Sequence, residues 1–338
     1  MAKIKVGVIG AGYWGPNLIR NFSMLPEADL QIVCDLDQKR QDHIRGRYPN
    51  VFTSGNYRDI LTSDIEAVAI ATPVSTHYSL TMDCLQAGKH VLIEKPIACC
   101  SSEANNIIAA GQEMGKIVMV GHTFVYNPAV VALKEIISSG EIGSVYYINS
   151  TRVNLGLYQP DINVVWDLAP HDISILLYVL GIAPFSASAR GGMYVKRGVH
   201  DVAYLTVHFP DGVMADLRVS WLDPCKIRRI TIVGSKKMLV YDDIEPVNKL
   251  KIYNKGVDVQ PYTDTYEDFH LAYRYGDEEP YPLKWDEPLK LECTHFLECI
   301  QSGNKPRSDG VEGLKVIRVI EAAQKSLMNG GRNEEILW

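Results

Sequence analysis

The sequence predicts an α/β fold in which an N-terminal, doubly wound parallel sheet precedes an α+β domain with a large, open, mostly antiparallel sheet. In the first third of the chain, short continuous apolar runs alternate with helical stretches, as in parallel strands covered on both faces. After Gly121, apolar and polar residues alternate instead, which indicates strands with one face toward a core. We therefore expect one domain over residues 1–123 and a second over residues 124–338.

The elements of the first domain follow from these runs. Right-handed crossovers between the strands would produce a doubly wound sheet. Strands are predicted over residues 3–9, 29–34, 67–71, 91–93 and 117–120, and helices over residues 16–25, 76–87 and 102–114.

The second domain is predicted to mix both kinds of element. Helices are expected over residues 127–138, 170–180, 287–302 and 311–327, and extended chain over residues 144–154 and 203–240. The segment 242–288 is polar and rich in Tyr and Pro, and its pattern predicts no clear element.

Composition excludes several classes of function. The 338 residues carry a formal net charge of −6 without a block of Lys and Arg, which argues against a nucleic-acid partner. No apolar run reaches the ~18 residues of a membrane span, so no membrane partner is expected. The seven cysteines form no CxxC pair, which is typical of free thiols in a reducing compartment. We expect a cytoplasmic protein.

A glycine-rich turn marks a dinucleotide site. Gly10, Gly12 and Gly15 form a GxGxxG pattern between the first predicted strand and the first helix, the context of a Rossmann domain. The glycines allow a tight turn, close approach of a pyrophosphate, and packing of helix on strand. Asp35 ends the second strand, where an acidic residue accepts the ribose hydroxyls. Since no Arg immediately follows Asp35, NAD is favoured over NADP.

Lys95 is the first candidate catalytic residue. Glu94-Lys95-Pro96 follows a predicted strand, and ligands of such sheets bind beyond the carboxyl ends of the strands. The stretch from Thr72 to His77 ends a strand at the same edge. Taken alone, Lys95 fits a surface lysine as well as a hydrogen-bond donor to a substrate hydroxyl.

These motifs together resemble the Gfo/Idh/MocA family, the group of glucose–fructose oxidoreductase and inositol dehydrogenase. The resemblance covers nearly the whole chain, and Glu-Lys-Pro combined with Asp-x-x-x-His is specific to this family. The matching residues are Gly10–Gly15, Asp35, Ala71-Thr72-Pro73 with His77, Glu94-Lys95-Pro96, Gly121-His122, Asn127-Pro128, Asp167-x-x-x-His171, Gly234 and Pro306-x-x-Asp309-Gly310.

The resemblance implies an NAD-dependent enzyme that oxidises a sugar hydroxyl. It implies that His171 is the general base and that Lys95 stabilises the developing alkoxide, while Asp167, one helical turn before His171, orients the imidazole or carries the proton onward. The residues expected to bind NAD are Gly10, Gly12, Tyr13, Trp14, Gly15, Asp35, Leu36, Thr72, Pro73, His77, Glu94 and Lys95. Those expected to bind substrate are Lys95, His122, Asn127, Arg152, Asn154, Asn163, Trp166 and His171.

The substrate branch rests on fewer residues. The Gly-Tyr-Trp-Gly-Pro-Asn start, Arg152-Val153-Asn154-Leu155-Gly156 and Trp166-Asp167-Leu168-Ala169-Pro170-His171-Asp172 resemble the nucleotide-sugar members, the UDP-N-acetylglucosamine and UDP-N-acetylglucosaminuronate 3-dehydrogenases. Many family members have glycines before the Asp and before the His; here Pro170 stands beside His171, where it would set the first helical turn. A free sugar or inositol is the alternative substrate, and a non-catalytic NAD-binding regulatory protein is the alternative class of function.

Other features carry less weight. No HExxH, HxH or Cys/His cluster occurs, so no metal is expected. Cys99 and Cys100 fit packing residues. The Tyr-rich series could line a sugar cleft or pack loops, and Lys226-Arg228-Arg229 fits a basic edge strand better than a diphosphate site. The tyrosines concerned are Tyr158, Tyr262, Tyr266, Tyr273, Tyr275 and Tyr281.

Assembly is also predicted. The face of the second sheet away from its helices is expected to be mostly apolar, because the family covers that face with another subunit. The resemblance therefore implies a homodimer or a homotetramer.

Overall fold

The computed structural model describes residues 3–156, 158, 162–259 and 271–338. The chain forms two compact units. The first unit comprises Met1–Asn127 with Asp286–Arg318, and the second comprises Pro128–Trp285 with Val319–Trp338. Tyr262 and Tyr266, considered above as cleft residues, lie outside the described residues.

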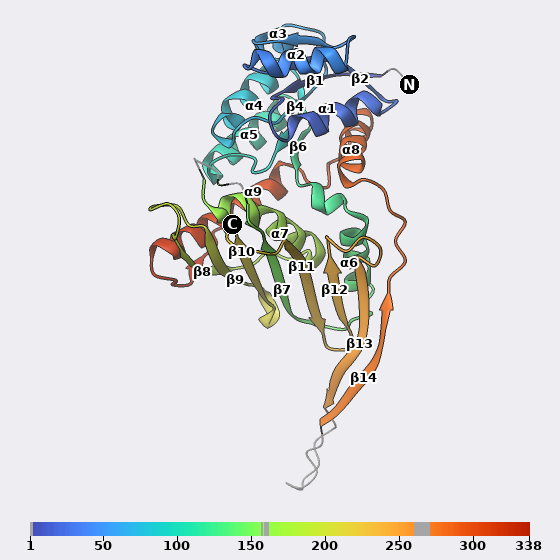
Figure 1. Cartoon of the computed structure of the whole chain (residues 1–338), viewed down its shortest axis with the longest axis vertical. Helices are drawn as coiled ribbons and strands as arrows, with labels where there is room; N and C mark the ends of the chain where they lie inside the picture. The colour runs from blue at the N-terminus through green and yellow to red at the C-terminus, as the bar shows by residue number, and fades with distance from the viewer. Residues whose placement is uncertain (1–2, 157, 159–161, 260–270) are drawn as a thin grey trace. The chain divides into compact units, whose positions relative to one another are not determined.

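The first unit is built on a six-stranded parallel sheet in the order β3-β2-β1-β4-β5-β6 (Figure 1). This arrangement confirms the predicted doubly wound sheet. The strands are β1 (Ile4–Ile9), β2 (Ala28–Cys34), β3 (Phe52–Ser54), β4 (Ala67–Ile70), β5 (His90–Glu94) and β6 (Val118–Gly121). The helical segments are α1 (Gly15–Met24), α2 (Gln38–Arg47), α3 (Arg58–Leu61), η1 (Val74–Thr76), α4 (His77–Gln86), α5 (Ser101–Glu113), η2 (Thr123–Tyr126) and α8 (Pro288–Ser302).

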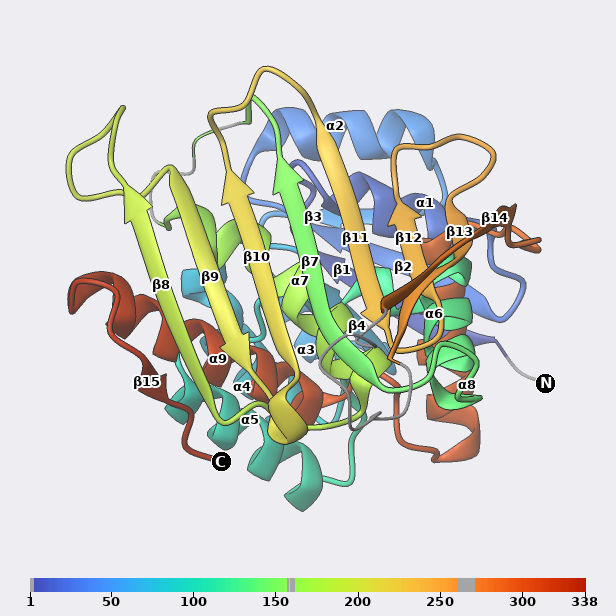
Figure 2. The same cartoon turned by 90° about the horizontal axis from the view of Figure 1, so that it is seen from below.

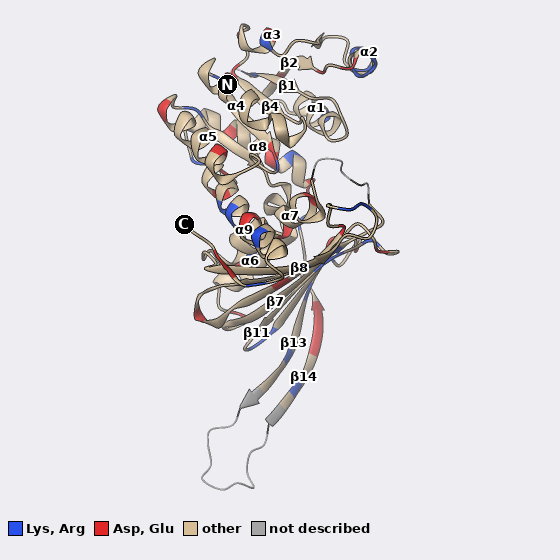
Figure 3. Ribbon diagram, turned by 90° about the vertical axis from the view of Figure 1, so that its left-hand side faces the viewer, with Lys and Arg blue, Asp and Glu red and all other residues tan. Residues whose placement is uncertain are grey.

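The central strand β4 shows the burial that its continuous apolar run predicted. All four residues of β4 are buried, because helices cover both faces of the sheet. The short elements β3, α2 and α3 were not predicted from the sequence. Helix α2 lacks an apolar stripe and carries a dense run of Lys and Arg instead (Figure 3), so its pattern resembles a polar loop.

The extent of the first unit differs from the single boundary expected after residue 123. Helix α8 packs against α1 and η2, and Arg20 forms an ion pair with Glu287 just before α8. Asp309 pairs with Met119 of β6. A segment late in the chain therefore completes this unit, which a boundary drawn along the sequence cannot represent.

The second unit contains a nine-stranded sheet in the order β14-β13-β12-β11-β7-β10-β9-β8-β15 (Figure 2). Strands β10 and β7 pair in parallel, and the other neighbours pair antiparallel, as predicted. The strands are β7 (Val145–Val153), β8 (Ser186–Gly192), β9 (Val202–His208), β10 (Met214–Ser220), β11 (Ile227–Gly234), β12 (Met238–Asp242), β13 (Leu250–Val259), β14 (Leu271–Pro280) and β15 (Glu334–Glu335). The helical segments are α6 (Pro128–Ser138), α7 (Val164–Leu180) and η3 (Pro210–Gly212), and α9 (Gly310–Met328) runs from the first unit into the second.

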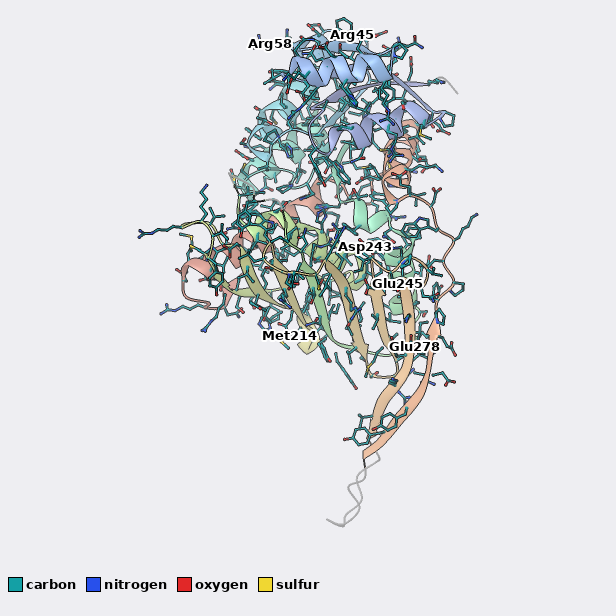
Figure 4. All side chains as sticks on the ribbon, in the orientation of Figure 1. Arg45, Arg58, Met214, Asp243, Glu245 and Glu278 are labelled. Atoms are coloured by element: carbon teal, nitrogen blue, oxygen red, sulfur yellow. The ribbon has the colours of Figure 1, made fainter. Side chains whose placement is uncertain are left out.

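The two faces of this sheet differ. Helices α6 and α7 contact one face, where Ile148, Leu205 and Leu217 are buried. The opposite face points toward the viewer in Figure 2 and bears Met214, which Figure 4 labels. The prediction that this face is mostly apolar is wrong, because polar side chains pair with each other there. The outward residues of the central strands are Tyr147, Asn149, Thr151, Tyr204, Thr206, His208, Met214, Asp216, Arg218, Arg229, Thr231, Val233, Met238, Val240 and Asp242.

Helix α7 begins earlier than predicted. Asn163 caps it, and its side-chain oxygen accepts hydrogen bonds from the backbone N–H groups of Val165 and Trp166. Pro170 therefore lies inside the helix, although its position suggested the first turn. The strong Asn cap sets the start, and the helix tolerates a proline that lacks a backbone donor.

The segment that the sequence left unassigned contributes the β13–β14 hairpin, which extends beyond the neighbouring strands (Figure 1). Acidic residues gather on β14 (Figure 3), and Glu278, labelled in Figure 4, forms an ion pair of 2.6 Å with Lys251 on β13. Among the described residues, no helix is long and apolar enough to cross a membrane.

Candidate active site

The glycine turn after β1 has the geometry that a dinucleotide requires. Gly10 has a φ of 99°, and a Cβ there would lie 2.5 Å from the carbonyl oxygen of Ala71. A Cβ on Gly15 would lie 2.1 Å from the carbonyl oxygen of Gly10. At Gly12 a Cβ would meet only the Arg40 side chain, at an ordinary 3.5 Å. Packing explains the first and third glycines, whereas Gly12 keeps the backbone open to an incoming phosphate.

The start of α1 leaves its amide groups available. No side chain caps this end of the helix, and its first turn contains no acidic residue. The helix therefore presents uncompensated positive charge, which suits a pyrophosphate. Tyr13 and Trp14 in the turn are both exposed.

Asp35 is held rigidly at the end of β2. Its carboxylate accepts hydrogen bonds from the N–H groups of Ala11, at 2.7 Å, and Asp37, at 2.8 Å. The following Leu36 is exposed. The structure also brings Arg40 of α2 to within 3.4 Å of the carboxylate. The residues directly after Asp35 gave no sign of this arginine, because it lies in the first turn of α2.

His77 joins two loops at the carboxyl edge of the sheet. Its ring nitrogens lie 2.9 Å from the carbonyl oxygen of Thr72 and 2.8 Å from that of Pro96. The side chain is buried, and burial lowers the pKa of its imidazole. His77 thus holds the Thr72-Pro73 turn beside the loop that carries Lys95, which is a supporting position relative to any bound cofactor.

The ends of β5 and β6 bring Glu94, Lys95 and His122 together. Glu94 is the register partner of Gly121, and a Cβ on Gly121 would lie 3.0 Å from the Glu94 carboxyl oxygens. His122 is buried; burial, and secondarily the charge of Lys95, lowers the pKa of its imidazole to about 3. A neutral imidazole therefore accompanies the cationic Lys95 at this edge.

Glu292 belongs to the same cluster and was not predicted from the sequence. It lies on α8 with no exposed surface, and its Oε2 accepts a hydrogen bond of 2.9 Å from Thr123. The available signal was its position within the apolar stripe of α8, beside Leu289, Cys293 and Phe296. A carboxyl group on a helix face that otherwise packs in a core indicates a specific environment.

The second unit supplies Asp167 and His171 on α7. These residues are four positions apart, so they share one face of the helix. The indole N–H of Trp221, which is almost fully buried after β10, donates a hydrogen bond of 2.9 Å to Asp167. Trp221 was not predicted, because it lies 54 residues from Asp167 in the sequence.

Arg152, predicted to bind substrate, is buried against α7. Its guanidinium donates two hydrogen bonds to Asp172, at 2.8 and 3.0 Å. Because Asp172 directly follows His171, this pair ties the turn of α7 that carries His171 to β7. The structure therefore places Arg152 where it positions the helix.

The remaining predicted substrate residues have different surroundings. Asn163 caps α7 and donates to Gln324 at 2.7 Å. Asn127 is buried at the end of η2, whereas Trp166 and Asn154 are partly exposed. A Cβ on Gly156 would lie 3.2 Å from Asn154 and 3.0 Å from Trp221, so Asn154 lies near the indole that binds Asp167.

The basic run and the possibility of a metal site can also be compared with the structure. The basic run at 226–229 leads into β11, which is an interior strand and not the expected edge strand. Arg228 pairs with Asp243, labelled in Figure 4, and Arg229 pairs with Asp242. Within the described ranges, no group of His, Cys, Asp and Glu has the geometry of a metal site.

The fold and the first unit's residues define an NAD-binding oxidoreductase. A family model described as an oxidoreductase family with an NAD-binding Rossmann fold matches residues 4–122, and the Gfo/Idh/MocA C-terminal domain matches residues 130–240. The chain belongs to the Gfo/Idh/MocA family. Its relatives include dehydrogenases of a nucleotide sugar and of inositol.

Three relatives illustrate the range. UDP-N-acetylglucosamine 3-dehydrogenase from Acidithiobacillus ferrooxidans is 27% identical, over 94% of this chain and 95% of its own, and its structure aligns with a TM-score of 0.80. Myo-inositol 2-dehydrogenase from Thermotoga maritima is 24% identical, with 96% of each chain covered. A protein from Magnetospirillum magnetotacticum MS-1, described as an oxidoreductase, is 30% identical with a TM-score of 0.82, covering 95% of this chain and 100% of that one.

Proposed function

We propose that this protein is an NAD-dependent dehydrogenase that oxidises a secondary hydroxyl of a sugar, at carbon 3 of a UDP-N-acetyl sugar. The observation that carries the proposal is the fixed carboxylate of Asp167, which lies one helical turn before His171 and accepts a hydrogen bond from a buried indole. In the NAD-binding unit, Lys95 directly follows β5, and the family resemblance implies that it acts on the same substrate oxygen as His171.

The catalytic roles follow from the chemistry of these side chains. His171 accepts the hydroxyl proton as the carbinol carbon loses hydride, and Asp167 orients its imidazole. Lys95 donates a hydrogen bond to the same oxygen, which stabilises the developing negative charge. The neighbouring His122 is neutral, because burial lowers the pKa of its imidazole, so the positive charge that stabilises the alkoxide comes from Lys95.

NAD binding rests on the first unit. Gly10, Gly12 and Gly15 with the start of α1 would hold the pyrophosphate, and Asp35 would accept the adenosine ribose hydroxyls. When bound, NAD supplies the hydride acceptor. The other residues we assign to NAD binding are Tyr13, Trp14, Leu36, Thr72, Pro73, Glu94 and Lys95. His77 supports this site by holding the carbonyl groups of Thr72 and Pro96.

The nucleotide-sugar assignment rests on the motif around His171 and on the similarity to UDP-N-acetylglucosamine 3-dehydrogenase. Inositol is the second candidate, because an inositol dehydrogenase is similar over the same length of chain. We assign substrate contacts to His122, Asn127, Asn154 and Trp166, and we expect a homodimer or homotetramer.

Formation of NADH during a substrate screen tests the proposal. The substrates are UDP-N-acetylglucosamine, its uronate, free N-acetylglucosamine, glucose and myo-inositol, each with NAD. The expected result is absorbance of NADH with a UDP-N-acetyl sugar that disappears in Lys95→Ala. Turnover of inositol alone would move the assignment to the polyol branch. Thermal stabilisation by NAD and sugar without any NADH would indicate a binding protein and contradict the enzyme.

A further inference from the structure

Glu94, Glu292 and His122 form a cluster beside Lys95 at the ends of β5 and β6, and several of its buried polar atoms have no partner among the described residues. Within the described part of the chain, Oε1 of Glu94, Oε1 of Glu292 and both ring nitrogens of His122 have no hydrogen-bond partner. Native proteins rarely leave several buried polar atoms unpaired in one place. Such a group indicates a site whose protonation or occupancy changes with function.

Backbone geometry directs the Glu94 carboxyl into this cluster. Its oxygens lie 3.0 Å from the position of a Cβ on Gly121, so a side chain there would press on the carboxyl and the glycine leaves it room. The Trp14 side chain, at the start of α1, is close enough to lower the pKa of the same carboxyl. Glu94 therefore links the glycine turn to the edge of the sheet that carries Lys95.

The charged groups around Glu94 come from four elements. Lys95 directly follows β5, His122 follows β6, Glu292 and Cys293 lie on α8, and Trp14 lies at the start of α1. Lys95 is the cation in this set, because the imidazole of His122 is neutral near pH 7. The Arg20–Glu287 pair beside α8 is internally neutralised.

The two carboxyls are expected to hold protons differently. Burial raises the pKa of Glu94 to about 7, against the opposing effects of Lys95 and Trp14. Burial, and then the Glu94 charge, raises the pKa of Glu292 well above its ordinary value. Two like charges in a shared buried site do not both ionise readily, so Glu292 stays neutral while Glu94 can ionise.

We propose that Glu94 is a proton site linked to the charge of the nicotinamide ring, ionised when oxidised NAD is bound and protonated when the ring is neutral, with Glu292 as its permanently neutral neighbour. The inference rests on NAD binding at this edge, as in the proposed function. Oxidised nicotinamide carries a positive charge, which favours the carboxylate. When a substrate's hydride, with its two electrons, removes that charge, Glu94 takes up one proton from solvent.

Binding measurements across pH test the proposal without catalysis. Because oxidised NAD favours ionised Glu94, its binding releases a proton below about pH 7, and its affinity must rise with pH up to that point. One linked proton gives at most about tenfold per pH unit. We expect a three- to tenfold rise in NAD affinity from pH 6 to pH 7.5. NADH and ADP-ribose, which lack the ring charge, should show a markedly smaller change.

Three variants test which carboxyl causes the pH dependence of NAD affinity. Glu94→Gln should remove the pH dependence of NAD affinity, leaving NAD and ADP-ribose with parallel profiles. Glu292→Gln keeps a neutral side chain of the same shape and should retain the wild-type dependence. Glu298→Gln, an exposed carboxyl on the same helix, is the matched control. Thermal unfolding of each variant checks that it remains folded.

The outcomes separate this inference from the proposed function. A pH dependence that survives Glu94→Gln, or that disappears in Glu292→Gln, would overturn the assignment of the titrating group. An equal dependence for NAD and ADP-ribose would overturn the link to the ring charge. Failure to bind NAD at any pH would instead contradict the proposed function.

Discussion

The indole N–H of Trp221 donates a 2.9 Å hydrogen bond to Oδ2 of Asp167, one helical turn before His171. The indole is almost fully buried, and the ring of Tyr158 packs on it at 5.1 Å between centroids. This hydrogen bond holds the Asp167 side chain in one rotamer. The Asp167 carboxylate is therefore already held in place to orient His171, the proposed base.

Trp221→Phe should impair catalysis and leave NAD binding unchanged. Hydrogen bonds to charged groups contribute about 1.5–3 kcal/mol, and we expect a loss of about tenfold in kcat with little change in the NAD dissociation constant. The acidic limb of the kcat–pH profile should also shift, because Asp167 then orients His171 less well. Trp285→Phe, at an exposed position, is the control. An unchanged pH profile in Trp221→Phe would remove Trp221 from the positioning role.

Removing one partner of the buried Arg152–Asp172 pair should strongly destabilise the second unit. Both side chains are buried, so Arg152→Met leaves an uncompensated carboxylate. Removing one partner of a buried pair typically costs about 3–5 kcal/mol, and the double variant Arg152→Met/Asp172→Leu should recover much of it. Denaturant unfolding measures both. Asp242→Asn, which breaks the exposed pair with Arg229, should cost below about 1 kcal/mol, and an equal loss in the two cases would contradict this account.

Cofactor choice should depend on Asp35 and Arg40 together. The wild type should prefer NAD, because the Asp35 carboxylate repels a 2′-phosphate. Asp35→Ser should raise NADP affinity, since Arg40 already lies beside that position, and Leu36→Arg should raise it further. Adding Arg40→Ala to Asp35→Ser should lower NADP affinity again. Titration of both cofactors measures this, and equal affinity of the wild type for NADP and NAD would show that Asp35 does not select.

Local patterns predicted the parts of the site that local spacing determines. The glycine turn, Asp35 and the continuous apolar strands around them lie within short stretches, so the doubly wound parallel sheet and the place of the glycine turn after β1 followed from sequence. The Asp167–His171 spacing followed in the same way once the family resemblance was recognised.

The missing parts depend on contacts between distant segments. Glu292 reaches the β6 end from α8, Trp221 reaches Asp167 across the second unit, and Arg152 is buried only because Asp172 neutralises it. The start of α7 was misplaced because Pro170 is a conspicuous signal and Asn163 a modest one. The β13–β14 hairpin alternates apolar and polar residues only over short stretches, such as Leu250-Lys251-Ile252, so no long periodicity indicated it.

Single-turnover reduction of bound NAD, followed across pH for the wild type, His171→Ala and Lys95→Ala, tests the proposed roles of His171 and Lys95 most directly. A positioned general base contributes about 10²–10⁴-fold, so His171→Ala should lose that much rate and the limb that requires a deprotonated group near neutrality. Because Lys95 acts on the same oxygen, the double variant should lose much less than the product of the two single losses. A His171→Ala enzyme that reduces bound NAD at the wild-type rate with the same pH limb would show that His171 is not the base.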